Sequence, residues 1–357
     1  MKAKTFALAI RPDKRYDKDK DGLHRKIERG LDMHPIKMTP AFRFGAMTPW
    51  GGSTLKDVFG KDIPDERTGE SLEVSVLPGL ESRTPDGRTL SQVLLEGGED
   101  ARGSEVGEEF PLLLKLISAR ERLSVQVHPD DAYARANEGG KLGKTEAWVI
   151  LDCKAGAQIV YGIREGVTKE QLASACAQGG KAVEDCLRYL PVQPGDVVYI
   201  PAGMVHAIGE DILILEIQQS SDVTYRFWDW GRLDKDGKAR ELHVQKGLDV
   251  TDVSLHLQPC QGERLRAMGG ARTRYIEDPN FVLERLSVKS SMPLEVMPKR
   301  FRLLTALCDG YLVEEGCAVK FKAGDSLFIP ASAGRIKLEC TGDLLLCYPG
   351  AGAAVKR

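Results

Sequence analysis

The sequence predicts a mainly β protein built from two related β domains, and three features of the chain indicate this. First, the chain has 357 residues, which is past the size at which a single hydrophobic core usually stops growing. Second, it contains 37 Gly and 18 Pro, and most of its apolar runs are short, as expected for strands joined by turns. Third, QPGDVVYIPAGM at 193–204 is echoed by KAGDSLFIPASA at 322–333, and a Gly-Asp turn before a short strand that ends at Pro is typical of a β-sandwich hairpin.

Composition and charge exclude several classes of partner. The 50 Lys and Arg nearly cancel the 52 Asp and Glu, so we expect no broad surface for nucleic acid or an anionic membrane. No apolar run approaches the ~18 residues of a membrane span, and residues 1–29 lack the apolar region and cleavage site of a secretory signal. None of the 8 Cys are in CxxC spacing, so we expect reduced thiols in a cytoplasmic protein.

The elements follow from local patterns along the chain. Residues 11–30 are charged and lack apolar periodicity, so we expect a mobile or loosely attached segment. A short helix is expected to begin within 91–95, and the capping-box pair Thr168 and Gln171 predicts a helical pair that Gly179 and Gly180 divide. Alternating or dense apolar runs predict strands at 69–75, 111–117, 123–128, 147–151, 157–161, 197–200, 212–218 and 224–227.

Four polar residues form a candidate metal site. Gln126 and His128 share one face of a predicted strand, about 7 Å apart by strand rise. Glu146 begins an apolar strand, and His206 follows a Pro-Gly turn. Two imidazoles, a carboxylate and an amide oxygen suit Zn²⁺ best, although Fe²⁺, Co²⁺ and Mn²⁺ accept the same donors. The spacing alone leaves open the alternative that each His is a hydrogen-bonded structural residue.

Longer motifs resemble those of one enzyme family. The pattern Gly195-x5-Pro201-x-Gly203-x2-His206 is similar to the second cupin motif. Over roughly residues 35–350 the chain resembles the bacterial branch of the type I mannose-6-phosphate isomerases, with the motifs in the family's order. These motifs are LSVQVHPD at 123–130, GKTEAW at 143–148, QSSDVTYR at 219–226, DWGR at 229–232 and GKARELHV at 237–244.

The resemblance implies a domain organisation. It implies two cupin jelly-roll β-sandwiches: a metal-bearing domain over 36–265, with a helical insertion at about 164–190, and a metal-free domain over 266–357. The charged segment 1–35 has no counterpart in the family. Leu72 occupies a position where the family usually has Trp, and we expect this to alter the rim of the site.

The resemblance also implies a cofactor. One Zn²⁺ per chain would be held by Gln126, His128, Glu146 and His206. In the second repeat Arg335 stands where His206 stands in the first, so we expect a metal in the first domain only.

The implied reaction is the isomerisation of mannose 6-phosphate to fructose 6-phosphate through an enediol(ate). This chemistry requires a general acid or base and fixed positive charge near the developing oxyanion. The resemblance implies that Arg226 is catalytic. Glu216 and Asp222 are candidate bases, and Lys144 is a candidate for ring opening, proton transfer or substrate anchoring.

Two further residues match family positions that face the substrate. Lys115 and Ser124 are expected to contact the phosphate of a small sugar phosphate. The structural alternatives are a strand lysine with a buried stem for Lys115, and a carboxylate paired with Lys or Arg for Glu216. We expect a monomer or a small homo-oligomer, and no partner among nucleic acids or membranes.

Two other functions compete with the isomerase. A metal-dependent cupin oxygenase uses two His and one carboxylate, but Gln126 adds a fourth ligand, and the charges of Lys144 and Arg226 suit a phosphorylated sugar better. A non-catalytic cupin that binds sugar phosphates as a regulator is the other alternative, because cupin folds host many roles. Loss of a ligand would mark such a regulator, and no ligand type is missing here.

Overall fold

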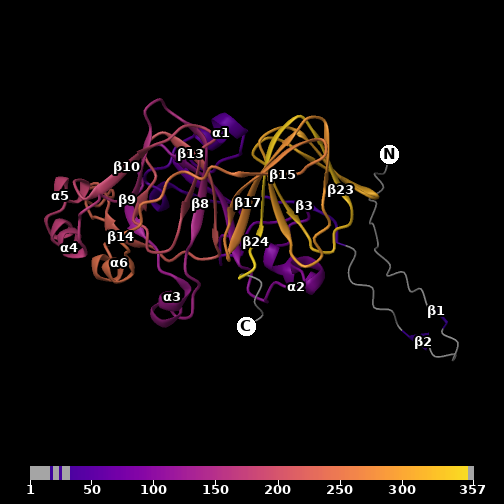
Figure 1. Cartoon of the computed structure of the whole chain (residues 1–357), viewed down its shortest axis with the longest axis horizontal. Coiled ribbons are helices and arrows are strands. Elements are labelled where there is room, and N and C mark those ends of the chain that lie inside the picture. Colours follow the sequence, from indigo (N-terminus) through magenta and orange to yellow (C-terminus); the bar gives the residue numbers. More distant parts are fainter. Residues whose placement is uncertain (1–16, 19–23, 26–32, 353–357) are drawn as a thin grey trace, which may run out of the picture.

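Two β-sandwiches lie side by side in the structure, a computed structural model that describes residues 17–18, 24–25 and 33–352 (Figure 1). The mainly β jelly-roll fold predicted from the sequence is confirmed. The expected N-terminal segment, 1–35, falls almost entirely outside the described residues. Within it, β1 (Asp17–Lys18) and β2 (His24–Arg25) pair antiparallel.

The first sandwich consists of a six-stranded and a five-stranded sheet. In spatial order, the six-stranded sheet contains β11 (Val197–Ile200), β8 (Glu146–Cys153), β13 (Ile212–Gln219), β6 (Leu112–Ala119), β5 (Thr68–Val74) and β4 (Ala41–Phe44). The five-stranded sheet contains β10 (Leu187–Pro191), β9 (Gln158–Ile163), β12 (His206–Ala207), β7 (Val125–Val127) and β14 (Tyr225–Trp228).

The second sandwich consists of a seven-stranded and a four-stranded sheet. The seven-stranded sheet contains β15 (Glu263–Leu265), β16 (Gly270–Glu277), β17 (Phe281–Val288), β24 (Gly342–Pro349), β19 (Arg302–Ala306), β22 (Ser326–Ile329) and β3 (Ile36–Lys37). The four-stranded sheet contains β18 (Ser291–Leu294), β23 (Ile336–Cys340), β20 (Gly310–Glu314) and β21 (Cys317–Phe321).

Short helices connect and flank the sheets. They are the 3-10 turn η1 (Gly45–Met47), α1 (Thr54–Phe59), α2 (Leu90–Arg102), α3 (Asp131–Asn137), α4 (Lys169–Gln178), α5 (Lys181–Glu184) and α6 (Val244–Val250). The predicted helical pair is α4 and α5, and Thr168 and Gln171 cap each other as a capping box. The helix expected near 91–95 is longer than predicted. Among the described residues, no helix has both the length and the apolar character that crossing a membrane requires.

The central strands have nearly unbroken apolar runs because side chains on both faces of the six-stranded sheet are buried. In β6, Leu114 and Leu116 face the seven-stranded sheet and join one apolar layer with Leu303 and Leu345. Lys115, between them, points into the first sandwich. Both faces of the sheet are therefore buried, as in other strand runs without polar alternation. Each fully buried leucine contributes about 2 kcal/mol to this contact.

The internal echo is a structural repeat. In both copies the Asp of the Gly-Asp turn accepts a hydrogen bond from the backbone N–H three residues earlier: Gln193 to Asp196 at 2.9 Å, and Lys322 to Asp325 at 2.8 Å. The glycines have left-handed φ values, +97° at Gly195 and +87° at Gly324, which disfavours any side chain there. β11 then pairs with β8, and β22 pairs with β19, in matching register.

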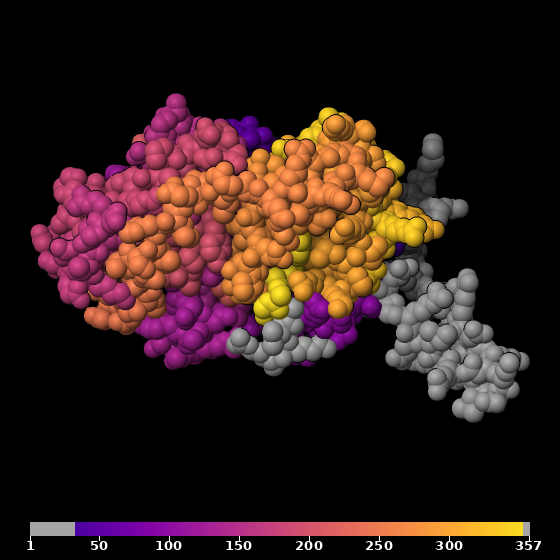
Figure 2. All heavy atoms as spheres, in the orientation of Figure 1, coloured from indigo at the N-terminus to yellow at the C-terminus, as the bar shows by residue number. Residues whose placement is uncertain are grey.

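Sheet membership adds detail to the predicted domain boundaries, which stay predictions. β3, near residue 36, and β15, which ends at residue 265, both pair within the seven-stranded sheet. Residues 251–262 connect the two sandwiches in the chain and run along the first one. The Asp252 N–H donates to the Gly203 carbonyl, and the Cys260 N–H donates to the Val197 carbonyl. This segment crosses from the first sandwich to the second in Figure 2. All eight Cys are free, as expected.

Candidate metal centre and its cavity

Three neighbouring strands of the first sandwich bring candidate ligands close together. His206 on β12 and Arg226 on β14 both pair directly with Gln126 on β7. Residues that pair directly across antiparallel strands project from the same face, so these three side chains form one row. Glu146, the first residue of β8, comes from the opposite sheet. Strand pairing thus places residues that are 80 positions apart in contact.

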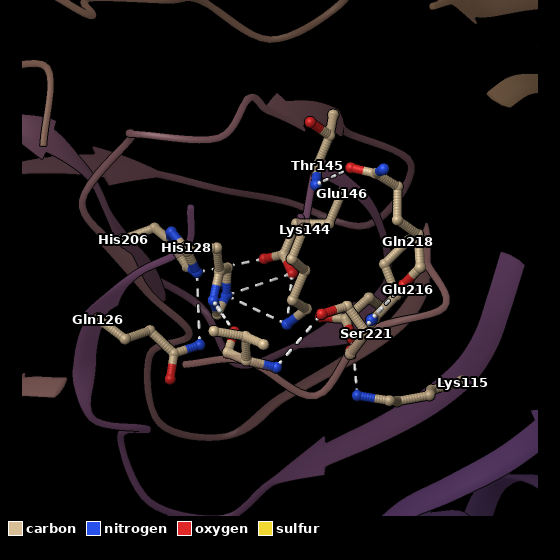
Figure 3. A network of polar contacts seen from close by, with 12 residues as sticks. Lys115, Gln126, His128, Lys144, Thr145, Glu146, His206, Glu216, Gln218 and Ser221 are labelled. Carbon is tan, nitrogen blue, oxygen red and sulfur yellow. Dashed lines mark hydrogen bonds and ion pairs between the residues drawn. The ribbon is translucent and has the colours of Figure 1, made fainter. Parts of the chain in front are cut away.

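His128, Glu146 and His206 form a compact buried cluster. Their ligand atoms all lie within 4.8 Å of one another (Figure 3). His206 Nε2 is 3.2 Å from Glu146 Oε1, and His128 Nε2 is 3.6 Å from Glu146 Oε2. The predicted convergence of these three residues is confirmed, and such a group of donors can hold a metal ion.

Backbone carbonyls orient both imidazoles. His128 Nδ1–H donates to the Val223 carbonyl at 2.8 Å, and His206 Nδ1–H donates to the Met204 carbonyl at 2.8 Å. A carbonyl accepts only, so each Nδ1 carries the proton and each Nε2 lone pair points into the cluster. Burial, reinforced by Lys144, holds the pKa of His128 well below its ordinary value, and burial lowers the pKa of His206 to about 4. Both rings are neutral at pH 7, as metal ligation requires.

The environment of the Glu146 carboxylate fits a metal ligand. It is fully buried, and neither of its oxygens accepts an aligned hydrogen bond. Lys144 Nζ lies 2.7 Å from Oε2 without hydrogen-bond alignment, and it also lies 3.1 Å from His128 Nε2. Burial raises the pKa of Glu146 to about 7 against the opposing charge of Lys144. A buried charge without alignment to its partner is costly, so this donor set fits a divalent ion.

Gln126 lies beside the cluster, and its side-chain amide is the fourth donor that the sequence predicts. Its Nε2 lies 3.3 Å from His206 Nε2, and its Oε1 accepts from Ser124 Oγ at 3.4 Å. An amide ligates a hard cation through oxygen, so ligation by Gln126 requires the rotamer that places Oε1 beside His206. Ser124, Gln126 and His128 share one strand face, as predicted.

A cavity beside the cluster collects most of the other predicted residues. Lys144, Lys115, Glu216, Ser124, Asp222 and Arg226 all line it. Lys115 Nζ and Glu216 Oε1 form an ion pair at 3.1 Å, and Trp148 Nε1 donates to Glu216 Oε2 at 3.0 Å. Although burial would raise it, Lys115 and Lys144 lower the pKa of Glu216 to about 2. Both oxygens of this carboxylate therefore have partners.

Arg226 and Asp222 stand at the cavity wall. Arg226 Nη1 donates to the Glu241 carbonyl at 2.8 Å, and its buried Nε has no partner. His243 holds the backbone of Arg226 from both sides, since its N–H donates to the Arg226 carbonyl and its Nδ1 lies 3.4 Å from the Arg226 nitrogen. These contacts give His243 a structural role. Asp222 is half-exposed and pairs with Lys141 at 2.8 Å.

Sequence reasoning missed three charged residues of the cavity. Arg43, Glu70 and Arg240 line it as well. Arg43 pairs with Glu70 at 3.2 Å, and Arg240 binds the buried Asp229 through two nitrogens. The only signal was that Arg240 lies within a motif of the family. Leu72, on β5, is expected to alter the rim. It is fully buried, pairs with Lys115 on β6, and is not among the residues that line the cavity. Since Leu72 pairs directly with Lys115, it projects from the same face of the sheet, and its effect on the rim stays a prediction.

Comparisons with known proteins identify the family of the chain. A family model described as phosphomannose isomerase type I, catalytic domain, matches residues 45–143. Mannose-6-phosphate isomerase ManA of Bacillus subtilis is 38% identical over 322 residues, covering 89% of this chain and 100% of that protein. The chain belongs to the type I phosphomannose isomerase family.

Other phosphomannose isomerases are similar over most of their length. The mannose-6-phosphate isomerase of Streptococcus mutans is 36% identical over 79% of this chain and 88% of that protein. The crystal structure of the mannose 6-phosphate isomerase from Bacillus subtilis matches with a TM-score of 0.81 and 34% identity, over 88% of this chain and 99% of that one.

Proposed function

We propose that this phosphomannose isomerase interconverts mannose 6-phosphate and fructose 6-phosphate with the help of one bound Zn²⁺. The observation that carries the proposal is the buried His128, Glu146 and His206 cluster beside a cavity rich in cations. The names of relatives that are 36–38% identical support the same reaction. Together they favour the isomerase over the oxygenase and the regulator, because no specific observation supports either of those.

The proposed ligands of the zinc are Gln126, His128, Glu146 and His206. The two neutral imidazoles and the carboxylate without an aligned hydrogen bond have the chemistry that zinc prefers. When bound, the ion would polarise the C1 and C2 oxygens of the open-chain sugar.

The cations of the cavity suit a doubly charged substrate. Arg226, Arg43 and Arg240 join Lys115 and Lys144 in its lining. We assign Arg226 to the enediolate, because its buried Nε is free to donate. Lys115 and Ser124 are proposed contacts of the phosphate.

Asp222 and Lys144 are the proposed groups for proton transfer. Asp222 is half-exposed at the wall, so we propose that its carboxylate takes the proton from one sugar carbon and returns it to the other. Lys144 would hold or deliver a proton at Nζ during ring opening. Glu216, bound by Lys115 and Trp148, would compensate the charge of the lysines instead.

The test combines metal analysis with an assay that couples fructose 6-phosphate formation to a spectroscopic signal. We expect zinc in the purified protein, loss of turnover in EDTA and recovery on adding zinc. Full activity in the metal-free protein would contradict the proposal. The same rate without oxygen would separate the isomerase from an oxygenase. The reaction would take place in the cytoplasm, in a monomer or small homo-oligomer.

A further inference from the structure

The second sandwich contains a cavity of its own, separate from the candidate metal centre. It has a volume of about 580 Å³ and is lined largely by apolar side chains, among them Leu286, Met292, Leu294, Met297 and Leu346. Met268, 75% exposed, lies at its edge. The volume falls in the range of pockets that hold small organic ligands, which is ~300–1,000 Å³.

One buried cation, Arg302, lines this apolar cavity. It is 1% exposed, and Nη1 donates to the Glu295 carbonyl at 2.6 Å. Its Nε and Nη2 are buried without any partner. Within the part of the chain that the structure describes, no carboxylate forms an ion pair with it, although the charge of Glu314 is near enough to raise its pKa slightly against the effect of burial. Burial lowers the pKa of Arg302 only to about 10, so the guanidinium stays charged at neutral pH.

The internal repeat shows that Arg302 occupies the counterpart of a metal-ligand position. Ile200 in the first repeat matches Ile329 in the second. Ile200 pairs with Glu146 across the β11–β8 ladder, and Ile329 pairs with Arg302 across the β22–β19 ladder. A buried carboxylate without an aligned hydrogen bond in one sandwich therefore corresponds, in the other, to a buried guanidinium whose Nε and Nη2 have no hydrogen-bond partner.

We propose that the second sandwich binds a small carboxylate with an apolar body, through Arg302. Nε–H and Nη2–H lie along one edge of a guanidinium and match the two oxygens of a carboxylate. The apolar side chains would surround the body of the ligand. The neighbouring Arg272 offers no second free edge, because its Nε and Nη2 bind Glu284 at 2.6 and 3.0 Å. Arg302 offers a single free guanidinium edge, and the nearby carboxylates of Glu284 and Glu295 add negative charge. The site should therefore prefer a ligand with one carboxylate to a doubly charged phosphate.

The test is calorimetric titration of the full, zinc-loaded chain with benzoate, using benzamide as the uncharged probe of the same shape. We expect one site per chain for benzoate and weaker binding of benzamide. Arg302→Met should weaken benzoate binding at least about tenfold, since it removes a charge-assisted bidentate pair. Arg264→Met, at an exposed arginine on β15, should leave binding unchanged.

Two further measurements keep the test decisive. Arg302→Met should retain isomerase turnover, which shows that the variant is folded. If it fails to fold, Arg302→Lys keeps the charge but lacks the two-nitrogen edge and should also lose benzoate binding. Unchanged affinity in the folded variant, or no benzoate binding by the parent chain, would overturn the proposal.

Discussion

Glu146 and Arg302 hold equivalent places in two β-sandwiches that otherwise share a turn, a strand pair and a register. Around Glu146 lie two imidazoles and an ammonium group. Around Arg302 lie mainly methionine and leucine side chains. The contrast shows that the jelly-roll backbone tolerates either charge at this depth, and that the neighbouring side chains decide the chemistry.

The buried ion pairs, by comparison, are alike in the two sandwiches. In the first sandwich Glu216 binds Lys115, and in the second Glu284 binds Arg272 and the Tyr348 hydroxyl. A buried carboxylate persists in each only because a cation compensates it.

The largest effect is expected from the repeat-matched pair His206 and Arg335. His206→Ala should remove bound zinc and turnover together, because the imidazole lies 3.2 Å from Glu146 in the cluster. Arg335→Ala, at an exposed side chain, should change neither. Elemental analysis and the coupled assay measure both. Zinc retained in His206→Ala would remove that residue from the ligand set.

The second effect separates binding of metal from catalysis. Arg226→Gln should lower kcat by about 10²–10³-fold, the usual cost of losing a donor to a developing oxyanion. Zinc content should not change, since Arg226 is not a proposed ligand. Arg164→Gln, at an exposed arginine outside the cavity, is the control. An unaltered kcat would remove Arg226 from catalysis.

The third effect is on stability and depends on pH. The pKa of Glu216 falls from 4.5 to about 2 on folding, so its charge stabilises the fold by about 3 kcal/mol above pH 4.5, and this is lost as the pH falls toward 2. Glu216→Gln should therefore lower the free energy of unfolding by about that amount at pH 7.

Urea unfolding of the metal-free proteins between pH 7 and 3 measures this difference. The gap between the parent chain and Glu216→Gln should shrink as the pH falls, whereas the exposed Glu165→Gln should show no gap. A gap that is constant with pH would mean that packing, rather than charge, holds Glu216.

The smallest effect is expected at Arg302. Arg302→Met should raise the free energy of unfolding by about 1–2 kcal/mol, because it replaces a buried unpaired cation with an apolar side chain of similar length. The corresponding change in the first sandwich, Glu146→Leu, would abolish zinc binding. A clear loss of stability in Arg302→Met would show that its bond to the Glu295 carbonyl outweighs the cost of burial.

Much of the site could be predicted because it depends on local order. The alternation around Gln126 and His128 determines which side chains share a face, and the capping box at Thr168 starts α4. Arg43 and Arg240 could not be found this way, because they reach the cavity from distant segments whose contacts are set by sheet pairing and by Asp229.

The order of amino acids alone specifies the two repeats, the strand faces and the types of ligand, since these depend on residues close together in the chain. The folded structure alone determines which buried charges find partners. Burial makes an unpaired charge costly, and only three-dimensional packing shows that Glu216 has its lysine while no carboxylate among the described residues forms an ion pair with Arg302.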